Sequence, residues 1–184
     1  GPSTTQELLS RGHNPDSVYE IHNGLDIEDF PLGESDNTPK IVFLGGLERY
    51  KGVDRIPEIH RHLNNIHEEP VHLDIAGRDG PMREKIENYC EKTEYAQFHG
   101  YVSMEKKVEL LQNAWVYIAT SRVEGCGIAV LEANACGTPA VGSDVSGLRD
   151  SIINEETGLL SDGDKPELFA EDVNKLLENE VCRT

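Results

Sequence analysis

Long apolar runs are missing from the 184-residue sequence. None approaches the roughly 20 consecutive apolar residues that a membrane-spanning helix needs. The chain also does not open with the charged and then apolar pattern of a secretion signal. We therefore expect neither a membrane-spanning nor a secreted protein, and we expect a cytoplasmic location.

An excess of basic residues is also missing. The chain has 17 Lys and Arg against 34 Asp and Glu, which gives a formal net charge of −17. Nucleic-acid binding depends on Lys and Arg that neutralise backbone phosphates and release counterions. We therefore expect no nucleic-acid partner, and a bound phosphate would need local backbone amides and a few well-placed cations.

Paired cysteines are the third absence. The four cysteines are Cys90, Cys126, Cys136 and Cys182, and none of their spacings forms a CxxC pair. This argues against a structural zinc site, a thioredoxin-like redox site and a disulfide scaffold. Reduced thiols in a cytoplasm fit best.

What the sequence does contain is an alternation of strand and helix patterns after residue 40. Strands alternating with helices of this length predict an α/β domain with a doubly wound, Rossmann-like parallel sheet. Ligands of such sheets bind beyond the carboxyl ends of the strands. The β-rich runs are 41–44, 71–76, 96–98, 115–120 and 140–141, and the helical patterns are 53–66, 82–93, 103–112 and 127–135.

The first 38 residues do not form a complete unit. A short helix is expected over 4–12, ending on a glycine, and an extended piece over 18–21. Residues 33–39 are polar and turn-rich, which is typical of a linker. We therefore expect 1–38 to be the tail of a preceding domain with its linker, and 39–184 to be one domain.

The loop after the first expected strand carries two glycines and a lysine. Gly45 and Gly46 allow close approach of a ligand to the backbone, and Lys51 places a cation near the start of the next helix. The loop matches neither a Walker loop nor GxGxxG. Its residues are equally compatible with a tight turn and a solvent-exposed lysine.

The loop after the fourth expected strand is the most informative. Gly125–Gly127 opens a helix whose first backbone amides are free to meet an anion. Glu124 precedes this helix, and Glu132 lies inside it among small apolar residues, which favours a position facing a cleft. Two carboxylates beside an amide-lined loop suit a ligand with hydroxyls at both ends and phosphate between them. Spacing alone equally allows an N-terminal charge and a solvent-exposed helix glutamate.

The two glutamates, separated by seven residues, resemble the signature of retaining glycosyltransferases with the GT-B fold, a group that includes glycogen synthases and bacterial mannosyltransferases. The resemblance covers roughly residues 18–178. Further ordered motifs carry it: His22-Asn23-Gly24-Leu25-Asp26 with Phe30, Lys51-Gly52, Gly77-Arg-Asp-Gly80-Pro81, Asp144-Val-Ser-Gly147-Leu-Arg-Asp150 and Thr157-Gly158-Leu159-Leu160.

The resemblance implies the C-terminal, nucleotide-sugar-binding half of a two-domain enzyme. Such an enzyme transfers sugar with retention and without a fixed metal, so we expect no resident metal or cofactor. Lys51 would contact the donor diphosphate, Glu124 the hydroxyls of the transferred sugar, and Glu132 the ribose hydroxyls. The implied partners are the nucleotide sugar and an N-terminal acceptor domain, through which a peripheral membrane contact is possible. The site residues are Lys51 and Glu124 as catalytic residues, and Gly45, Gly46, Arg49, Gly100, Tyr101, Val102, Gly125, Cys126, Gly127, Ile128 and Glu132 as donor-binding residues.

The sequence departs from the family pattern at three positions. Gly46 stands where the family usually has an arginine, so Arg49 is the neighbouring cation expected to reach the same phosphates. Cys126 replaces a common aromatic residue, and Asp150 replaces a common glutamate. Two alternatives to a transferase half remain open. One is a non-catalytic nucleotide-sugar-binding module, which the missing arginine leaves open. The other is a GT-B-fold sugar-nucleotide epimerase, although the two glutamates with Lys51-Gly52 favour transfer.

The triplet Asp162-Gly163-Asp164 imitates the Asp-x-Asp metal site of other glycosyltransferases. It follows a short apolar run and precedes Pro166 and a helical stretch. We therefore expect it to serve as a turn and a helix N-cap.

Overall fold

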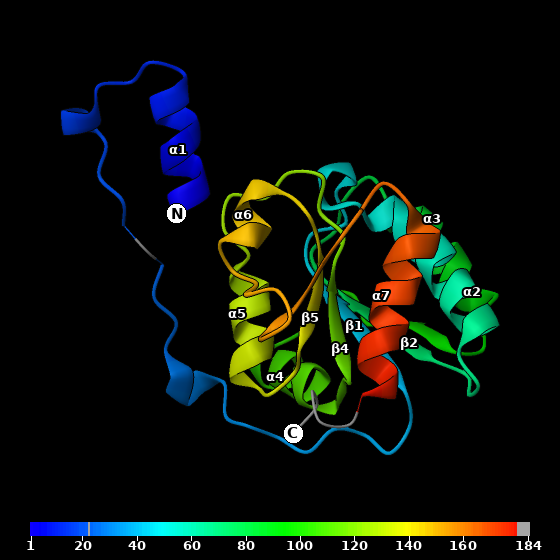
Figure 1. Ribbon diagram of the computed structural model, residues 1–184. Helices are drawn as coiled ribbons and strands as arrows, with labels where there is room; N and C mark the ends of the chain where they lie inside the picture. Colours follow the sequence, from blue (N-terminus) through cyan, green and yellow to red (C-terminus); the bar gives the residue numbers. More distant parts are fainter. Residues whose placement is uncertain (22, 180–184) are drawn as a thin grey trace.

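A six-stranded, all-parallel sheet forms the centre of the molecule (Figure 1). The computed structural model describes residues 1–21 and 23–179, so His22 of the linker motif and residues 180–184 of the expected domain lie outside the described residues. The strand order is β3-β2-β1-β4-β5-β6. The strands are β1 (Lys40–Leu44), β2 (His72–Ala76), β3 (Ala96–Phe98), β4 (Val116–Ala119), β5 (Ala140–Ser143) and β6 (Gly158–Ser161).

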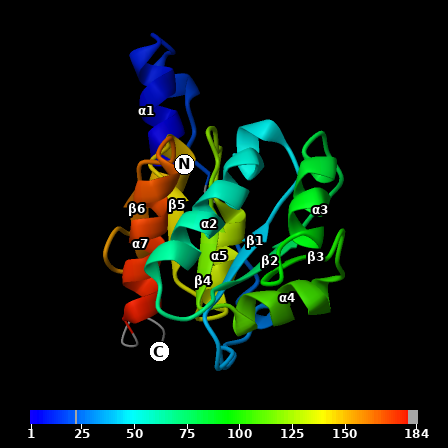
Figure 2. The same cartoon turned by 90° about the vertical axis from the view of Figure 1, so that its right-hand side faces the viewer.

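Helices cover both faces of the sheet (Figure 2). One face packs on α2 (Ile56–Ile66), α3 (Arg83–Glu91) and α7 (Pro166–Glu178). The other packs on α4 (Met104–Asn113), α5 (Ile128–Ala135) and α6 (Ser146–Arg149). The remaining elements are α1 (Pro2–Ser10) and four short 3₁₀ turns: η1 (Pro15–Ser17), η2 (Ile27–Asp29), η3 (Arg49–Lys51) and η4 (Val53–Arg55).

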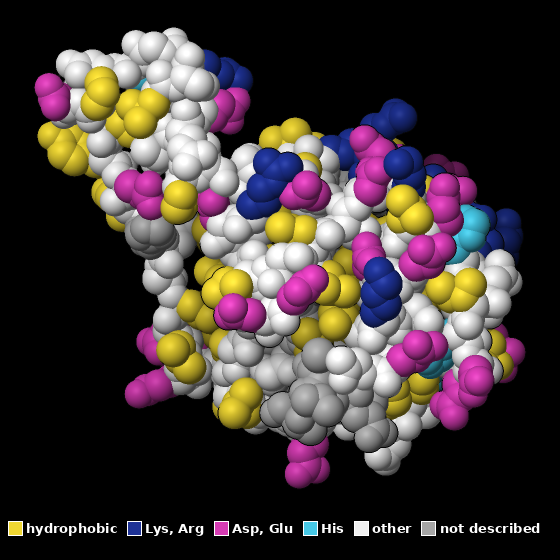
Figure 3. Space-filling model, in the orientation of Figure 1, with side chains coloured by type: hydrophobic (Ala, Val, Ile, Leu, Met, Phe, Trp, Pro, Cys, Tyr) yellow, Lys and Arg dark blue, Asp and Glu magenta, His cyan; other side chains and the backbone are white. Residues whose placement is uncertain are grey.

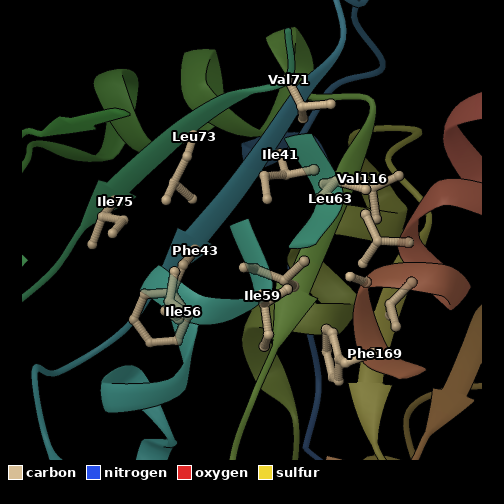
Figure 4. Close-up of a cluster of buried hydrophobic side chains, with 14 of the residues drawn as sticks. Ile41, Phe43, Ile56, Ile59, Leu63, Val71, Leu73, Ile75, Val116 and Phe169 are labelled. Carbon is tan, nitrogen blue, oxygen red and sulfur yellow. The ribbon is translucent and has the colours of Figure 1, made fainter. Parts of the chain in front are cut away.

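The apolar runs of the strands follow from burial on both faces. Along β1, Ile41 and Phe43 point into the core beneath α2 and α7, together with Ile59 and Phe169 (Figure 4). The intervening Val42 enters the second core, beneath α4 and α5. A strand buried on both faces has no polar side to alternate with, so it appears in the sequence as a continuous apolar run.

The doubly wound parallel sheet expected from the sequence is confirmed. The five expected strands agree with β1–β5 to within about two residues, and Ser103 caps α4 as its side chain accepts a hydrogen bond from the Lys106 amide at 3.3 Å. The sixth strand, β6, was absent from the expected set. It is a four-residue edge strand whose only strand partner is β5 among the described residues, so its apolar signal is short.

An N-terminal arm stands away from the body of the domain (Figure 3). Helix α1 covers residues 2–10 rather than 4–12, and it contacts α6 where Ser3 Oγ donates a hydrogen bond to Asp150 at 2.6 Å. Farther along, Phe30 is buried in the second core. On the face drawn in Figure 3, Lys and Arg are interspersed with Asp and Glu.

From β1 the chain adds strands β2 and β3 on one side, and from β4 it adds β5 and β6 on the other. Strands β1 and β4 therefore lie side by side in the centre, although 71 residues separate the end of β1 from the start of β4. Ile41 is the register partner of Val116, so the carboxyl ends of both strands meet at one edge. The glycine–lysine loop leaves β1 there, and the loop with Glu124 leaves β4 there. This switch point is the position at which doubly wound sheets bind ligands. Within the described residues, no helix is long and apolar enough to cross a membrane.

Gly52 ends η3 in a left-handed conformation, with φ of 67°, and its Cα packs against the backbone of Thr120. A Cβ at this position would overlap the Thr120 carbonyl oxygen. We therefore expect Gly52→Ala to lower the free energy of unfolding by about 1–3 kcal/mol in urea titrations. Gly46→Ala is the control in the same loop, because a Cβ there has its nearest neighbour at 3.7 Å and φ is not positive. Equal stability of the two variants would contradict this.

Candidate ligand-binding site

A cavity of about 840 Å³ opens at the switch point, beyond the carboxyl ends of β1, β2 and β4. Its volume lies within the usual range for small-molecule sites. The wall comes from four loops and from the first turns of α4 and α5. The expected site residues on it are Gly45, Gly46, Lys51, Tyr101, Val102, Glu124, Cys126, Gly127, Ile128 and Glu132.

Lys51 and Glu124 face each other across the cavity wall. Lys51 Nζ lies 2.7 Å from Glu124 Oε2, and Ser121 Oγ donates a second hydrogen bond to the same oxygen at 3.0 Å. Both side chains are largely buried, with 25% and 14% of their area exposed. Each group thus compensates the charge of the other, and an anion that binds Lys51 leaves the Glu124 carboxylate available for donors of its own.

Glu132 forms a second carboxylate–ammonium pair on the same wall. Its Oε1 lies 2.5 Å from Lys107 Nζ, and its side chain is only 10% exposed. The Lys107 ammonium also lies 5.4 Å from the centre of the Phe30 ring. Lys107 was missed in the sequence because nothing there distinguishes it from Lys106, which pairs with the exposed Glu109 on the same helix.

Tyr117 of β4 lies on the cavity wall and is buried. Its hydroxyl donates a hydrogen bond to the Leu44 carbonyl oxygen at 3.2 Å. Burial raises the pKa of this phenol, and the Glu124 and Glu132 carboxylates raise it further. The phenol therefore stays neutral and remains a hydrogen-bond donor to the Leu44 carbonyl oxygen.

Three expected site residues are not on the cavity wall: Arg49, Gly100 and Gly125. Arg49 is exposed, and its carbonyl oxygen accepts a hydrogen bond from Arg122 at 2.7 Å. Arg49 therefore lies away from the cavity wall in the structure, and its contact with the phosphates stays a prediction. The 3₁₀ turn η3 directs Lys51 toward the cavity and leaves Arg49 in solvent.

The amide of Gly127 is not free, contrary to expectation. It donates a hydrogen bond to Ser151 Oγ at 3.2 Å, and the next amide, of Ile128, bonds the Cys126 carbonyl oxygen. The cause is close packing on α6, since a Cβ on Gly127 would lie 2.9 Å from Leu148 Cδ2. The helix N-terminus thus offers fewer free donors to an anion than the sequence predicted.

The triplet that imitates a metal site forms a turn, as expected. The Asp164 amide bonds Asp162 Oδ1, and the two carboxylates pair with Arg55 and Lys165. The expected N-cap role is wrong, because the residue that precedes α7 is Lys165 and no side chain caps this helix. The described residues contain no group of three or more His, Cys, Asp or Glu side chains placed to hold a metal ion.

The sheet is that of a Rossmann-like domain, and the cavity at its switch point is the candidate ligand site. Residues 26–184 match the family described as "Glycosyl transferases group 1", and the chain belongs to this family. The resemblance noted in the sequence is thereby confirmed.

The chain is similar to proteins about twice its length. A D-inositol 3-phosphate glycosyltransferase of Corynebacterium diphtheriae is 28% identical, over 99% of this chain and 48% of that protein. An α-maltose-1-phosphate synthase of Mycolicibacterium smegmatis is 30% identical, over 80% of this chain and 42% of that protein. The chain thus spans about half the length of these relatives.

Solved structures share the fold. Sucrose-phosphate synthase from Thermosynechococcus elongatus superposes with a TM-score of 0.84 at 22% identity, over 100% of this chain and 49% of that one. The Anabaena protein HepE in complex with UDP gives a TM-score of 0.84 at 17% identity, over 100% of this chain and 54% of that one.

We expect Lys107→Met to lower the free energy of unfolding by about 1–3 kcal/mol in urea titrations, because it leaves the Glu132 carboxylate buried without its cation. The paired variant Lys107→Met with Glu132→Gln should recover part of the loss, since the uncompensated charge is then gone. Lys106→Met is the control, because its ion pair is exposed. A double variant no more stable than Lys107→Met would contradict the pairing.

Proposed function

We propose that this chain is the donor-binding domain of a retaining glycosyltransferase, and that its cavity binds a nucleoside diphosphate sugar. The observation that carries the proposal is the presence of two buried carboxylate–lysine pairs, Lys51–Glu124 and Lys107–Glu132, on one cavity at the switch point. A nucleotide sugar has hydroxyls at its two ends and negative charge between them, which matches carboxylates on either side of a cation.

Each group has a defined task under this proposal. Glu132 accepts hydrogen bonds from the ribose hydroxyls, and the ion pair with Lys107 orients that carboxylate. Lys51 binds the diphosphate, which gains negative charge as the bond to the sugar breaks, so its ammonium stabilises the transition state more than the ground state. Tyr101 and Val102 also lie on the cavity wall, and we propose that they contact the base.

Donor binding exchanges the partner of Lys51. In the structure its ammonium neutralises Glu124. When a diphosphate takes the ammonium, the Glu124 carboxylate becomes free to accept hydrogen bonds from the sugar hydroxyls. The same carboxylate thereby stabilises the empty site and orients the sugar in the filled one, without a metal ion to compensate the charge.

In this proposal, the acceptor binds to the rest of a longer protein. The relatives that the chain matches are about twice its length, and the cavity is open at the strand ends, where Tyr50, Val123 and Tyr101 are exposed. We propose that an acceptor domain closes this side. Retention of configuration at the sugar belongs to the same proposal.

A non-catalytic nucleotide-sugar-binding module is the second candidate. It is favoured by Gly46 at the place of the usual arginine and by the exposure of Arg49, which leave Lys51 as the cation of this loop on the cavity. A longer protein that binds the donor but transfers no radiolabelled sugar would indicate this module.

The proposal is tested by a thermal-shift screen of the chain against UDP, GDP and ADP, each with and without attached glucose or mannose. Binding to the native state raises the melting temperature. We expect one base to be preferred, and we expect radiolabelled transfer by the longer protein from the matching sugar nucleotide with an unchanged anomeric configuration. Absence of any shift with all three nucleotides would contradict a donor site.

Glu132→Ala should weaken binding of the preferred nucleoside diphosphate about tenfold or more in calorimetric titrations, because a charged hydrogen bond contributes about 1.5–3 kcal/mol. Glu124→Gln should leave the affinity for the sugar-free nucleotide nearly unchanged, and should reduce the transfer rate of the longer protein steeply. Glu109→Ala, on the exposed side of α4, is the control. Full affinity in a folded Glu132→Ala variant would remove Glu132 from the site.

Gly46→Arg should tighten diphosphate binding by up to about 1.5–3 kcal/mol, because a guanidinium grips phosphate oxygens through two hydrogen bonds. The backbone accepts the change: φ at Gly46 is not positive, and the nearest atom to a Cβ is Glu48 Cγ at 3.7 Å. Gly46→Ala separates the effect of a Cβ from that of the charge. Equal affinities of the two variants would show that Gly46 is not the position of the missing arginine.

A further inference from the structure

Arg122 makes a concentrated set of contacts beside the cavity without lying on its wall. Its guanidinium pairs with both carboxylate oxygens of Asp54, with Nη1–Oδ1 at 2.6 Å and Nη2–Oδ2 at 2.9 Å. The same Nη1 donates to the Arg49 carbonyl oxygen at 2.7 Å, and the Arg122 amide donates to the Tyr50 carbonyl oxygen at 2.8 Å. One residue of the β4 loop thus holds three residues of the β1 loop.

A neighbouring contact extends this attachment to the lysine itself. Thr120 Oγ1 donates to the Lys51 carbonyl oxygen at 2.9 Å, and Gly52 packs against the Thr120 backbone. The carbonyls of Arg49, Tyr50 and Lys51 are therefore all bonded to the segment that runs into Glu124. The side chains that form the 2.7 Å pair of the site come from two loops joined in this way.

The geometry of the Arg122–Asp54 pair is specific to arginine. A planar guanidinium presents parallel N–H groups to a carboxylate, which an ammonium does not. The guanidinium also holds the pKa of the Asp54 carboxyl below its usual range. Asp54 is 19% exposed, so the pair is partly shielded from solvent.

We propose that Arg122 is a positioning residue: by fixing the turn Arg49–Lys51 to the β4 loop, it aims the Lys51 ammonium at the diphosphate. This inference rests on the proposed function of Lys51. It does not make Arg122 a phosphate ligand, because its guanidinium is engaged by Asp54 and by the Arg49 carbonyl and is not on the cavity wall.

The constraint matters in this chain because the first loop has no arginine on the cavity. Gly46 occupies the usual place, and Arg49 is exposed. Lys51 has a flexible side chain, and a flexible cation loses side-chain entropy whenever it binds one phosphate oxygen. The hydrogen bonds to three consecutive carbonyls already restrict the backbone of the turn. Phosphate binding therefore costs the entropy of the Lys51 side chain but no further backbone entropy.

The test uses calorimetric titration of UDP, GDP and ADP into this chain carrying Arg122→Lys, Lys51→Met or both substitutions. Arg122→Lys should weaken binding of the preferred nucleotide about tenfold, since the bidentate pair and the carbonyl contact are lost together. If Arg122 acts through Lys51, the same substitution should change affinity less than about twofold in the Lys51→Met background. Equal losses in both backgrounds, or no loss in either, would overturn the proposal.

Two further variants distinguish the loss of the Arg122 contacts from a general loss of folding. Asp54→Asn disrupts the bidentate pair from the other side but keeps the Arg49 carbonyl contact, so it should weaken nucleotide binding in the same direction and by less than Arg122→Lys. Arg83→Lys is the matched control, since Arg83 is also ion-paired to a helix carboxylate and makes none of the contacts to the β1 loop. Its affinity should equal that of the unaltered chain.

Amide hydrogen exchange gives a readout that needs no nucleotide. In Arg122→Lys, exchange at residues 49–52 should accelerate, while α2 and α7 keep their protection. Unchanged exchange at residues 49–52 would contradict the claim that Arg122 fixes this turn to the β4 loop. If the unaltered chain binds none of the three nucleotides, the proposed function fails, and the exchange experiment still decides whether Arg122 holds the Lys51 turn.

Discussion

The ion pair between Lys51 and Glu124 is the interaction on which the candidate site depends. It forms because the sheet places β1 beside β4, which brings together the loops that follow these two strands. Lys51 Nζ and Glu124 Oε2 thus lie 2.7 Å apart although 73 positions separate the two residues in the sequence. The rest of the wall builds on this pairing: the β4 loop leads into α5, which carries Glu132, and Glu132 in turn pairs with Lys107. The candidate site for an anionic ligand thus lies in a chain whose formal net charge is −17.

Local charge outweighs net charge in this arrangement. A chain with twice as many acids as bases repels a diphosphate at long range, but such repulsion is screened over about 10 Å at 0.1 M salt. Inside the cavity, Lys51 and Lys107 are largely buried and act at hydrogen-bond distance. Each already neutralises a glutamate, so the empty site contains no uncompensated charge on these four residues. In the proposed function, a donor replaces only the Lys51–Glu124 pair, and its sugar hydroxyls then satisfy the Glu124 carboxylate.

The sequence predicted what depends on local pattern. The strands buried on both faces, Ile41–Leu44 for instance, have a continuous apolar signal, and the loops that follow β1 and β4 are marked by glycine and charge. Lys107 and Arg122 were not predicted to matter, because their roles depend on partners far away in sequence, and a lysine on a polar helix carries no local sign of a buried partner. The prediction that the Gly127 amide is free was wrong for the same reason, because the packing of α6 brings Ser151 to this amide from a distant part of the sequence.

The central claim is that one cavity binds the two ends of a nucleotide sugar on opposite sides of Lys51. A crystal structure of the chain with its preferred nucleoside diphosphate measures this directly. The account predicts the ribose hydroxyls on Glu132, the diphosphate on Lys51, and a Glu124 carboxylate that has left the Lys51 ammonium. A nucleotide bound elsewhere, or bound in this cavity while the Lys51–Glu124 pair stays closed at about its present 2.7 Å, would contradict it.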